Sequence, residues 1–158
     1  MHKKAIIFGI KSFNLTSKEK KLFRRYKPWG IILFSRNIKN LSQAKKLVIN
    51  IRKIFKDKKY PILIDQEGGK VSRLNKIIDL SCFSQNYFGN LYKKDKNLFL
   101  NYYKIYVDAT SSLLKSIGVN INTVPVLDVR RKSSHSIIGS RSFSSIPKDV
   151  SLLGNICI

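Results

Sequence analysis

The sequence predicts an α/β domain with a parallel sheet. Short apolar runs of strand length alternate with polar stretches in which apolar residues recur at helical spacing, and this alternation is typical of buried parallel strands joined by helices. The chain has 158 residues, of which 43% are hydrophobic, enough for one domain with a core. Four such units fit either a doubly wound sheet or part of a (β/α)₈ barrel, and both folds bind ligands at the carboxyl ends of their strands.

The first part of the chain supplies three strands and two helices. Three apolar runs have the length and composition of buried strands: Ala5–Ile10, Gly30–Phe34 and Pro61–Asp65. After the first run, residues Thr16–Glu19 (TSKE) match a capping box, which predicts a helix over residues 17–26. Apolar residues recur at helical spacing over Ser42–Lys56 and predict the second helix.

The second part of the chain is expected to be less regular. Residues 75–95 are rich in Asn, Ser and Lys, and we expect irregular structure there. A long helix is predicted from Asp95 to Ser116, with Gly118 as its C-cap. Three further segments follow: a fourth strand region over Val119–Asp128 that Pro125 interrupts, a Ser- and Arg-rich loop over Arg130–Ser145, and a last helix that Pro147 can open.

Charge and cysteine content narrow the class of protein. The formal net charge of +22 raises a nucleic-acid-binding domain as one candidate, but lysines spread over every polar stretch favour a biased composition over a specific nucleic-acid interface. Cys82 and Cys157 lie far apart and form no disulfide or zinc pattern. The apolar run after the amino terminus is too short for a signal peptide, and no run is long enough to span a membrane, so we expect a cytoplasmic protein.

Carboxylates at strand ends are the first candidates for chemistry. Among only nine carboxylates, Asp65, Glu67 and Asp128 lie at or just past the carboxyl ends of predicted strands. A carboxylate in such a place must be paired, hydrogen-bonded or directed at a ligand. The glycine pair Gly68-Gly69 follows at once and allows a positive φ or a close approach of the backbone, and Arg73 can return to the same edge of the sheet.

Four blocks of sequence carry a resemblance to a known family. In order, they are GIILFSRN (30–37), DQEGGKVSR (65–73), VPVLDV (124–129) and IGSRSF (138–143). Together they resemble the N-terminal (β/α)₈ domain of glycoside hydrolase family 3, of the bacterial β-N-acetylhexosaminidase type. The resemblance implies a barrel of which residues 1–158 supply about four β/α units. It also implies removal of terminal β-linked N-acetylglucosamine from peptidoglycan fragments, without a metal or other cofactor.

The same resemblance assigns roles to individual residues. Asp65 matches the carboxylate that holds sugar hydroxyls, and Arg73 and Arg141 match arginines that line the same subsite. Carboxylates accept hydroxyl hydrogen bonds and guanidinium groups donate to sugar oxygens, so the chemistry agrees. Glu67 and Asp128 are expected to have supporting roles in bracing the loops. The partner expected at this site is an amino sugar or a muropeptide.

The resemblance also implies reacting groups that this sequence does not contain. In the family, a later Lys-His-Phe-Pro-Gly-His-Gly segment carries the acid/base histidine and a Ser-Asp-Asp segment carries the nucleophile, and neither occurs in residues 1–158. We therefore expect a substrate-binding half, inactive alone, and assign no catalytic residue. Three origins are open: a disrupted gene, which is favoured, a split enzyme with a complementary chain, or a homodimer. A sugar-binding module without catalysis remains an alternative function.

Overall fold

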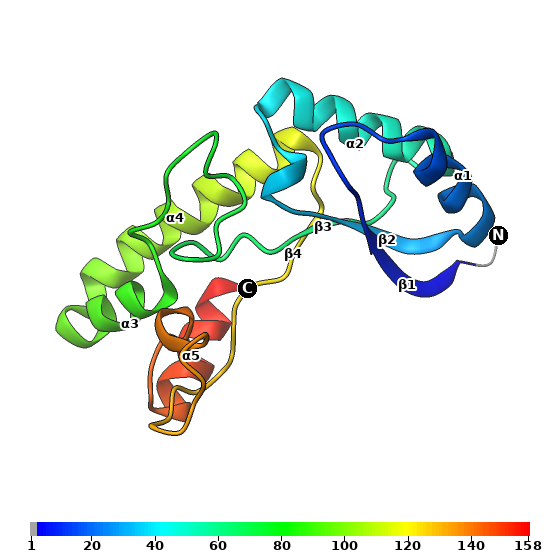
Figure 1. The fold of residues 1–158 in the computed structure, drawn as a ribbon. Coiled ribbons are helices and arrows are strands. Elements are labelled where there is room, and N and C mark those ends of the chain that lie inside the picture. Colours follow the sequence, from blue (N-terminus) through cyan, green and yellow to red (C-terminus); the bar gives the residue numbers. More distant parts are fainter. Residues whose placement is uncertain (1–2) are drawn as a thin grey trace.

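The computed structural model describes residues 3–158, and its centre is a parallel sheet of four strands. The strands lie side by side in the order of the sequence (Figure 1): β1 (Lys4–Gly9), β2 (Pro28–Leu33), β3 (Ile62–Ile64) and β4 (Ile121–Asn122). This confirms the predicted α/β class with its parallel sheet. All four carboxyl ends therefore point the same way, and the loops that follow the strands emerge at one edge.

Five helices connect or follow these strands. They are α1 (Ser17–Tyr26), α2 (Leu41–Phe55), α3 (Gln85–Lys94), α4 (Lys96–Ile117) and α5 (Pro147–Cys157), and two short 3₁₀ turns, η1 (Ser35–Asn37) and η2 (Gly139–Arg141), lie in the loops after β2 and β4. The capping box at α1 is present, because Glu19 donates its backbone N–H to Thr16 and Thr16 donates its own to the Glu19 carboxylate. Pro147 occupies the first turn of α5, as expected.

Two sequence predictions in the second half of the chain were wrong. Residues 75–95 are not irregular throughout, because α3 begins after the N-cap Ser84. This helix is stabilised by tertiary packing, in which Phe88 is buried. The fourth strand covers only two residues of the predicted Val119–Asp128 region, because Asn122 and Thr123 turn their side chains to the backbone and side chains beside β3.

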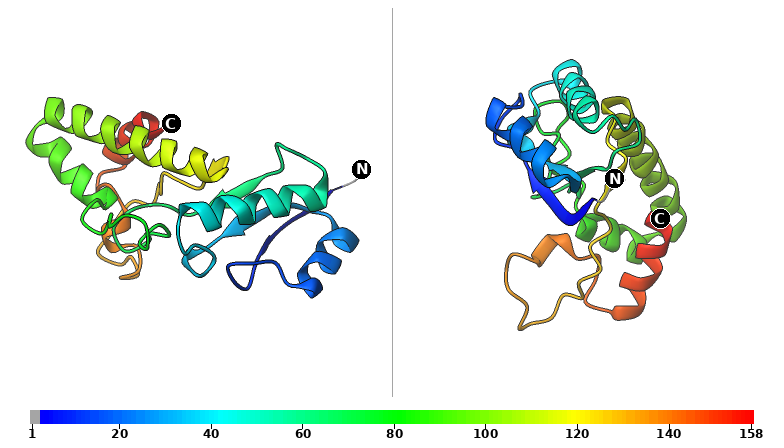
Figure 2. Two further views of the ribbon diagram at one scale, coloured as in Figure 1. Left: turned by 90° about the horizontal axis from the view of Figure 1, so that it is seen from above. Right: turned by 90° about the vertical axis from the view of Figure 1, so that its right-hand side faces the viewer.

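Helix α4 joins two hydrophobic clusters. The first lies between the sheet and helices α1 and α2 and includes Leu114 and Ile117 from the end of α4. The second lies among α3, α4, α5 and the loop after β4, and includes Phe99 and Tyr103 from the beginning of α4. Figure 2 shows α1 and α2 at one end of the molecule and α3 to α5 at the other. Because α4 contributes to both clusters, it fixes the position of the loop after β4 relative to the sheet.

The remaining features concern membranes and thiols. Of the helices within residues 3–158, none combines the length and apolar character that crossing a bilayer requires. Cys82 and Cys157 are both free thiols, the first exposed and the second partly buried. The sequence expectation that they form no disulfide is confirmed.

Candidate functional site

The segment that follows β3 sends three successive side chains to three different partners. Asp65 faces Arg73, Gln66 faces the backbone N–H groups of residues 73 and 74, and Glu67 faces Arg141. The segment itself is held by the next strand, because the Asn122 side chain accepts a hydrogen bond from the Gln66 N–H at 2.9 Å and donates one to the Gln66 carbonyl at 3.1 Å. Such a two-sided amide clamp fixes the direction in which each of the three side chains leaves the backbone.

Asp65 forms the first carboxylate–arginine pair. Arg73 Nη2 lies 3.5 Å from Asp65 Oδ2, and the Thr123 hydroxyl donates to the other carboxylate oxygen. Both charged side chains keep about a quarter of their surface exposed, 26% for Asp65 and 25% for Arg73. A ligand can therefore reach lone pairs of the carboxylate and N–H groups of the guanidinium at the same point.

Gln66 fixes where Arg73 returns to this pair. Its side chain is 2% exposed, and its carbonyl oxygen accepts hydrogen bonds from the backbone N–H groups of Arg73 at 2.7 Å and of Leu74 at 3.1 Å. A buried amide whose oxygen is satisfied in this way holds the loop rigidly. The loop from Asp65 to Arg73 is therefore held in the conformation that brings Arg73 back to Asp65.

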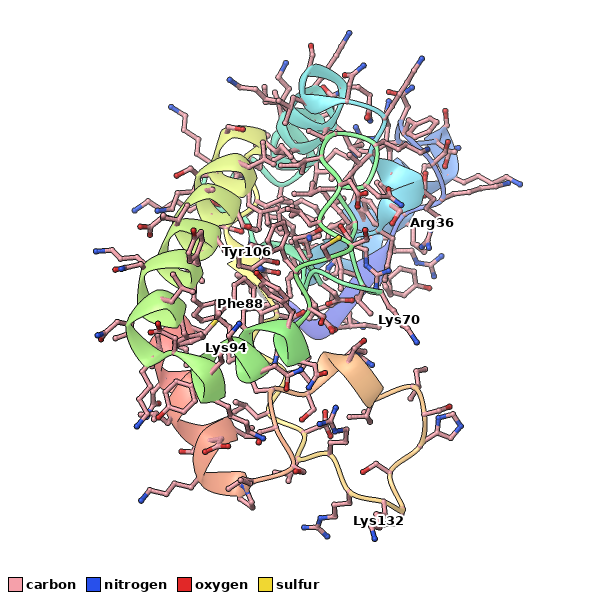
Figure 3. The ribbon with its side chains drawn as sticks, turned by 90° about the vertical axis from the view of Figure 1, so that its left-hand side faces the viewer. Arg36, Lys70, Phe88, Lys94, Tyr106 and Lys132 are labelled. Carbon is pink, nitrogen blue, oxygen red and sulfur yellow. The ribbon has the colours of Figure 1, made fainter. Side chains whose placement is uncertain are left out.

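Aromatic stacking holds the same arginine from another side. The guanidinium carbon of Arg73 lies 5.4 Å from the centre of the Phe34 ring, and that of Arg36 lies 4.5 Å from it. Arg36 also donates from Nε to the Ile10 carbonyl at 3.0 Å. Figure 3 shows Arg36 and Lys70 on the same side of the molecule, and Lys132 far from them in the loop after β4. The loops after β2 and β3 thus bring Arg36 and Arg73 to the same Phe34 ring, and of these two arginines Arg73 pairs with Asp65.

Glu67 forms the second and tighter carboxylate–arginine pair. Arg141 Nε donates to Glu67 Oε2 at 2.8 Å, and Arg141 Nη2 donates to Glu67 Oε1 at 2.7 Å. The Glu67 side chain is 6% exposed, whereas that of Arg141 is 26% exposed. The hydrogen bonds that Arg141 donates to Glu67 raise the pKa of Arg141, and the negative charges of Asp128 and Asp65 act in the same direction. All three negative charges therefore favour the charged form of Arg141, and Glu67 is the carboxylate that contacts it.

The two glycines after Glu67 are required by the local backbone. Gly68 and Gly69 have φ values of 84° and 58°. A Cβ on Gly68 would lie 2.2 Å from the Phe83 carbonyl oxygen, and one on Gly69 would lie 2.7 Å from Ser84 Cβ. Since L-residues with side chains disfavour these conformations, the pair lets the loop turn tightly against the start of α3.

A tyrosine and a cavity lie beneath this loop. The Tyr106 hydroxyl donates to the Glu67 carbonyl at 3.2 Å, and burial raises the pKa of Tyr106 to about 12. Tyr106 and Phe88 lie against each other between α4 and α3 (Figure 3), with ring centres 4.9 Å apart. The cavity beside them has a volume of about 170 Å³ and is also lined by Asn122 and Cys157. Aromatic packing thus supports the loop that carries Glu67.

The other acidic and titratable candidates are less constrained. Asp128 is exposed, its backbone carbonyl accepts a hydrogen bond from the Ser142 hydroxyl at 2.6 Å, and within residues 3–158 its carboxylate has no hydrogen-bond partner. His135 is exposed, and its Nδ1 accepts from the Ile137 N–H. Over residues 3–158 no three His, Cys, Asp or Glu side chains group together as a metal site would require.

Several contacts at this site could not be found from the sequence. The pairing of Glu67 with Arg141 joins residues 74 positions apart, and the clamp from Asn122 to Gln66 joins residues 56 positions apart. The sequence offered only general signals for them: Glu67 follows a predicted strand, Asn122 lies in the predicted fourth strand region, and the family resemblance places Arg141 at the sugar subsite. The structure brings Asp65 together with Arg73 and Glu67 together with Arg141, and it places Asp128 close enough to act on Arg141 electrostatically.

Comparisons with known proteins found a matching family model and several named relatives. The family model for the glycosyl hydrolase family 3 N terminal domain matches residues 3–158. Beta-hexosaminidase A of Pseudoalteromonas piscicida is 33% identical over 137 residues, which are 84% of this chain and 22% of that protein. A beta-hexosaminidase of Xanthomonas campestris pv. campestris is 28% identical over 92% of this chain and 43% of its own length.

A solved structure has the same fold over nearly all of the chain. NagZ from Neisseria gonorrhoeae, crystallised in complex with N-trifluoroacetyl-D-glucosamine, superposes with a TM-score of 0.86 at 28% identity. The match covers 98% of this chain and 46% of the NagZ chain. The chain described here therefore spans less than half the length of these relatives.

Proposed function

The chain belongs to glycosyl hydrolase family 3, whose N-terminal domain model covers residues 3–158, and we propose that it supplies the sugar-binding half of a β-N-acetylhexosaminidase. The proposed reaction is removal of a terminal β-linked N-acetylglucosamine from peptidoglycan fragments. Relatives named beta-hexosaminidase and the structure of NagZ with an N-acylated glucosamine support this assignment. Since the chain spans 43% of the Xanthomonas relative, the activity of the whole enzyme is part of the proposal.

One observation carries the proposal: two carboxylate–arginine pairs meet at the carboxyl end of the sheet. Asp65 with Arg73, and Glu67 with Arg141, present partly exposed N–H donors beside carboxylate acceptors. A sugar carries hydroxyl groups that donate and accept and an acetamido carbonyl that accepts, so its needs match this set. The edge of the sheet at the carboxyl ends of parallel strands is also where folds of this class bind their substrates.

Each residue has a defined task in this proposal. The Asp65 carboxylate accepts hydrogen bonds from two neighbouring sugar hydroxyls, while its Thr123 and Arg73 contacts hold it in place. Arg73 and Arg141 donate to oxygens of the same sugar ring and orient it. Retaining hydrolysis further needs a nucleophile and a proton donor, and we propose that both come from polypeptide outside residues 1–158. That polypeptide is a further segment of the same chain or a complementary chain.

Sugar binding by residues 1–158 tests the site. We expect N-acetylglucosamine to bind with a dissociation constant in the millimolar range, measured by NMR titration, and Asp65→Ala to weaken binding at least about tenfold. Asp57→Ala is the matched control, because Asp57 pairs with Lys3 on the surface at 3.1 Å, and we expect it to bind like wild type. Equal binding by the Asp65→Ala protein would remove the assignment of the site.

Turnover separates the enzyme from a sugar-binding module. With 4-nitrophenyl N-acetyl-β-D-glucosaminide, we expect no hydrolysis by residues 1–158 alone. Hydrolysis by a protein that contains a complete family 3 domain with this N-terminal half should be lost on Asp65→Ala. Hydrolysis by residues 1–158 that Asp65→Ala leaves unchanged would contradict both the site and the proposed division of roles. Binding without turnover in any such complete protein would favour the module.

The net charge does not single out a nucleic-acid interface. Lysines lie on each of the five helices of the described chain rather than on one face. We expect DNA binding to weaken uniformly as the salt concentration approaches physiological strength.

A role in cell-wall recycling in the cytoplasm is part of the proposal. Fractionation of cells that express the tagged protein tests the location.

A further inference from the structure

The sugar site is close to electrically balanced although the protein is strongly basic. The chain carries 31 Lys and Arg against 9 Asp and Glu, yet each of the two site arginines has its own carboxylate, Asp65 for Arg73 and Glu67 for Arg141. Using two of nine carboxylates at one site is a strong local departure from the composition. Their placement decides what charge the site offers to a ligand.

The Glu67 pair fixes both the direction and the free donors of Arg141. A guanidinium group has five N–H donors in one plane. Glu67 accepts two of them, from Nε and Nη2, at 2.8 and 2.7 Å. The three remaining N–H groups, two on Nη1 and one on Nη2, are left for a ligand, and 26% of the Arg141 side chain is exposed. Without the two-point contact the long side chain would sample other rotamers.

Glu67 can hold this position because it is itself fixed. Its side chain is 6% exposed, and its backbone carbonyl accepts the hydrogen bond from Tyr106. Its backbone N–H donates to the Val71 carbonyl at 3.0 Å. With both backbone groups and both carboxylate oxygens engaged, Glu67 is placed to act on Arg141 rather than to contact a ligand.

We propose that Glu67 is a positioning and specificity-determining residue: its buried carboxylate orients Arg141 and cancels its charge, so that the site selects an uncharged sugar over an acidic one. This inference rests on the proposed function, since it concerns the same sugar site. The negative charges of Asp65 and Asp128 also act on the Arg141 guanidinium and stabilise its charged form. A ligand carboxylate would therefore meet an Arg141–Glu67 pair that is already neutral, with the balanced Asp65–Arg73 pair and the negative charge of Asp128 near it.

Removing only the charge of Glu67 should reverse this preference. Glu67→Gln keeps the shape and retains one acceptor oxygen, but it leaves the Arg141 cation without its carboxylate. A partly buried cation without a partner attracts an anion strongly. The variant is then expected to bind N-acetylglucosamine less well, because Arg141 is no longer held at two points, and to gain affinity for a sugar acid.

The experiment compares N-acetylglucosamine with D-glucuronate by NMR titration of the 158-residue chain at 20 and 300 mM salt. We expect wild type to prefer the uncharged sugar at both salt concentrations despite the net charge of +22. Glu67→Gln should shift the ratio of the two affinities towards glucuronate by at least about tenfold at low salt. Asp57→Asn removes one surface carboxylate elsewhere, and its ratio should equal that of wild type.

The outcomes distinguish this inference from the proposed function. Equal sugar preference in wild type and Glu67→Gln would overturn the inference and leave the site intact. A wild-type preference for glucuronate at low salt would also overturn it, without depending on how the variant folds. Failure of wild type to bind N-acetylglucosamine, with the Arg141 Nε–H resonance still showing the Glu67 contact, would instead overturn the proposed function.

Discussion

A single methyl group on α3 is expected to disturb the loop that carries Arg141. Gly89 lies on the face of α3 that packs against this loop, and a Cβ there would lie 1.9 Å from the Phe143 carbonyl oxygen and 2.8 Å from its carbonyl carbon. Both neighbours are backbone atoms and cannot rotate away. Gly89→Ala therefore forces α3 and the loop apart, two residues from Arg141.

The size of the effect follows from this geometry. Ordinary van der Waals contact begins at 3.4 Å, so the carbonyl must retreat by about 1.5 Å. Overpacking of this kind costs about 1–3 kcal/mol, and the better helix propensity of alanine returns about 1 kcal/mol of it. Because both clashing atoms are backbone, we take the upper end of the range, about 3 kcal/mol. The net cost is then about 2 kcal/mol, which for a domain of this size lowers Tm by about 4–8 °C.

Thermal unfolding and sugar titration measure the two consequences separately. Gly154→Ala is the matched control, because Gly154 is also inside a helix. Its Cβ would meet only side-chain atoms, and the single close one is Leu127 Cδ2 at 2.6 Å, the end of an exposed side chain that can move. We expect that variant to be as stable as wild type or slightly more stable. Gly89→Ala should also weaken N-acetylglucosamine binding by about tenfold or more, since a shift of this size misplaces Arg141.

Equal Tm values for the two alanine variants would refute the reasoning, because the only difference between the sites is what the new methyl group meets. Loss of stability with unchanged sugar binding would show that the loop after β4 relaxes without moving Arg141. In that case the bidentate contact with Glu67, and not the packing of Phe143 on α3, sets the position of the guanidinium.

Three further predictions concern the cap of α1, a buried amide and the thiols. Thr16→Ala should cost about 1 kcal/mol at pH 7. Burial acts to raise the pKa of Glu19, but hydrogen bonds from Thr16 and from the Lys11 backbone, together with the charge of Lys11, outweigh it and hold that pKa below 4.5. The stabilisation is therefore complete above about pH 4.5 and lost as the pH falls through the lower folded-state pKa, so urea titrations of variant and wild type should converge in acid. Asn37→Leu should cost about 3 kcal/mol in urea unfolding, because the fully buried amide makes three hydrogen bonds to backbone, and a cost below about 1 kcal/mol would contradict this account. Cys82 is exposed, whereas burial raises the pKa of the Cys157 thiol, so Ellman's reagent should modify Cys82 at least about tenfold faster at pH 8.

The strands and capped helices were accessible from sequence because their causes are local. The capping box at α1 satisfies backbone donors within four residues, and the apolar runs that form β2 and β3 need burial whatever covers them. Helix α3 had a local signal too, with Ser84 as N-cap and apolar residues at Phe88 and Leu91. Its polar composition concealed that signal, and packing against α4 and η2 stabilises it.

The sequence determined which chemical groups lie near the site, and the tertiary structure determined which of these groups contact each other. The sequence alone determined which groups stand at the carboxyl ends of the strands: Asp65 and Glu67 directly after β3, and two arginines further on. Only the tertiary structure decided which arginine each carboxylate holds, because Glu67 and Arg141 are 74 residues apart. Their 2.7 Å contact depends on α4 and α3 bringing the loop after β4 back over the sheet. Local conformation depends on neighbouring residues in the sequence. A pair of distant residues forms only where the packing of other elements offsets the entropy lost on closing the chain between them.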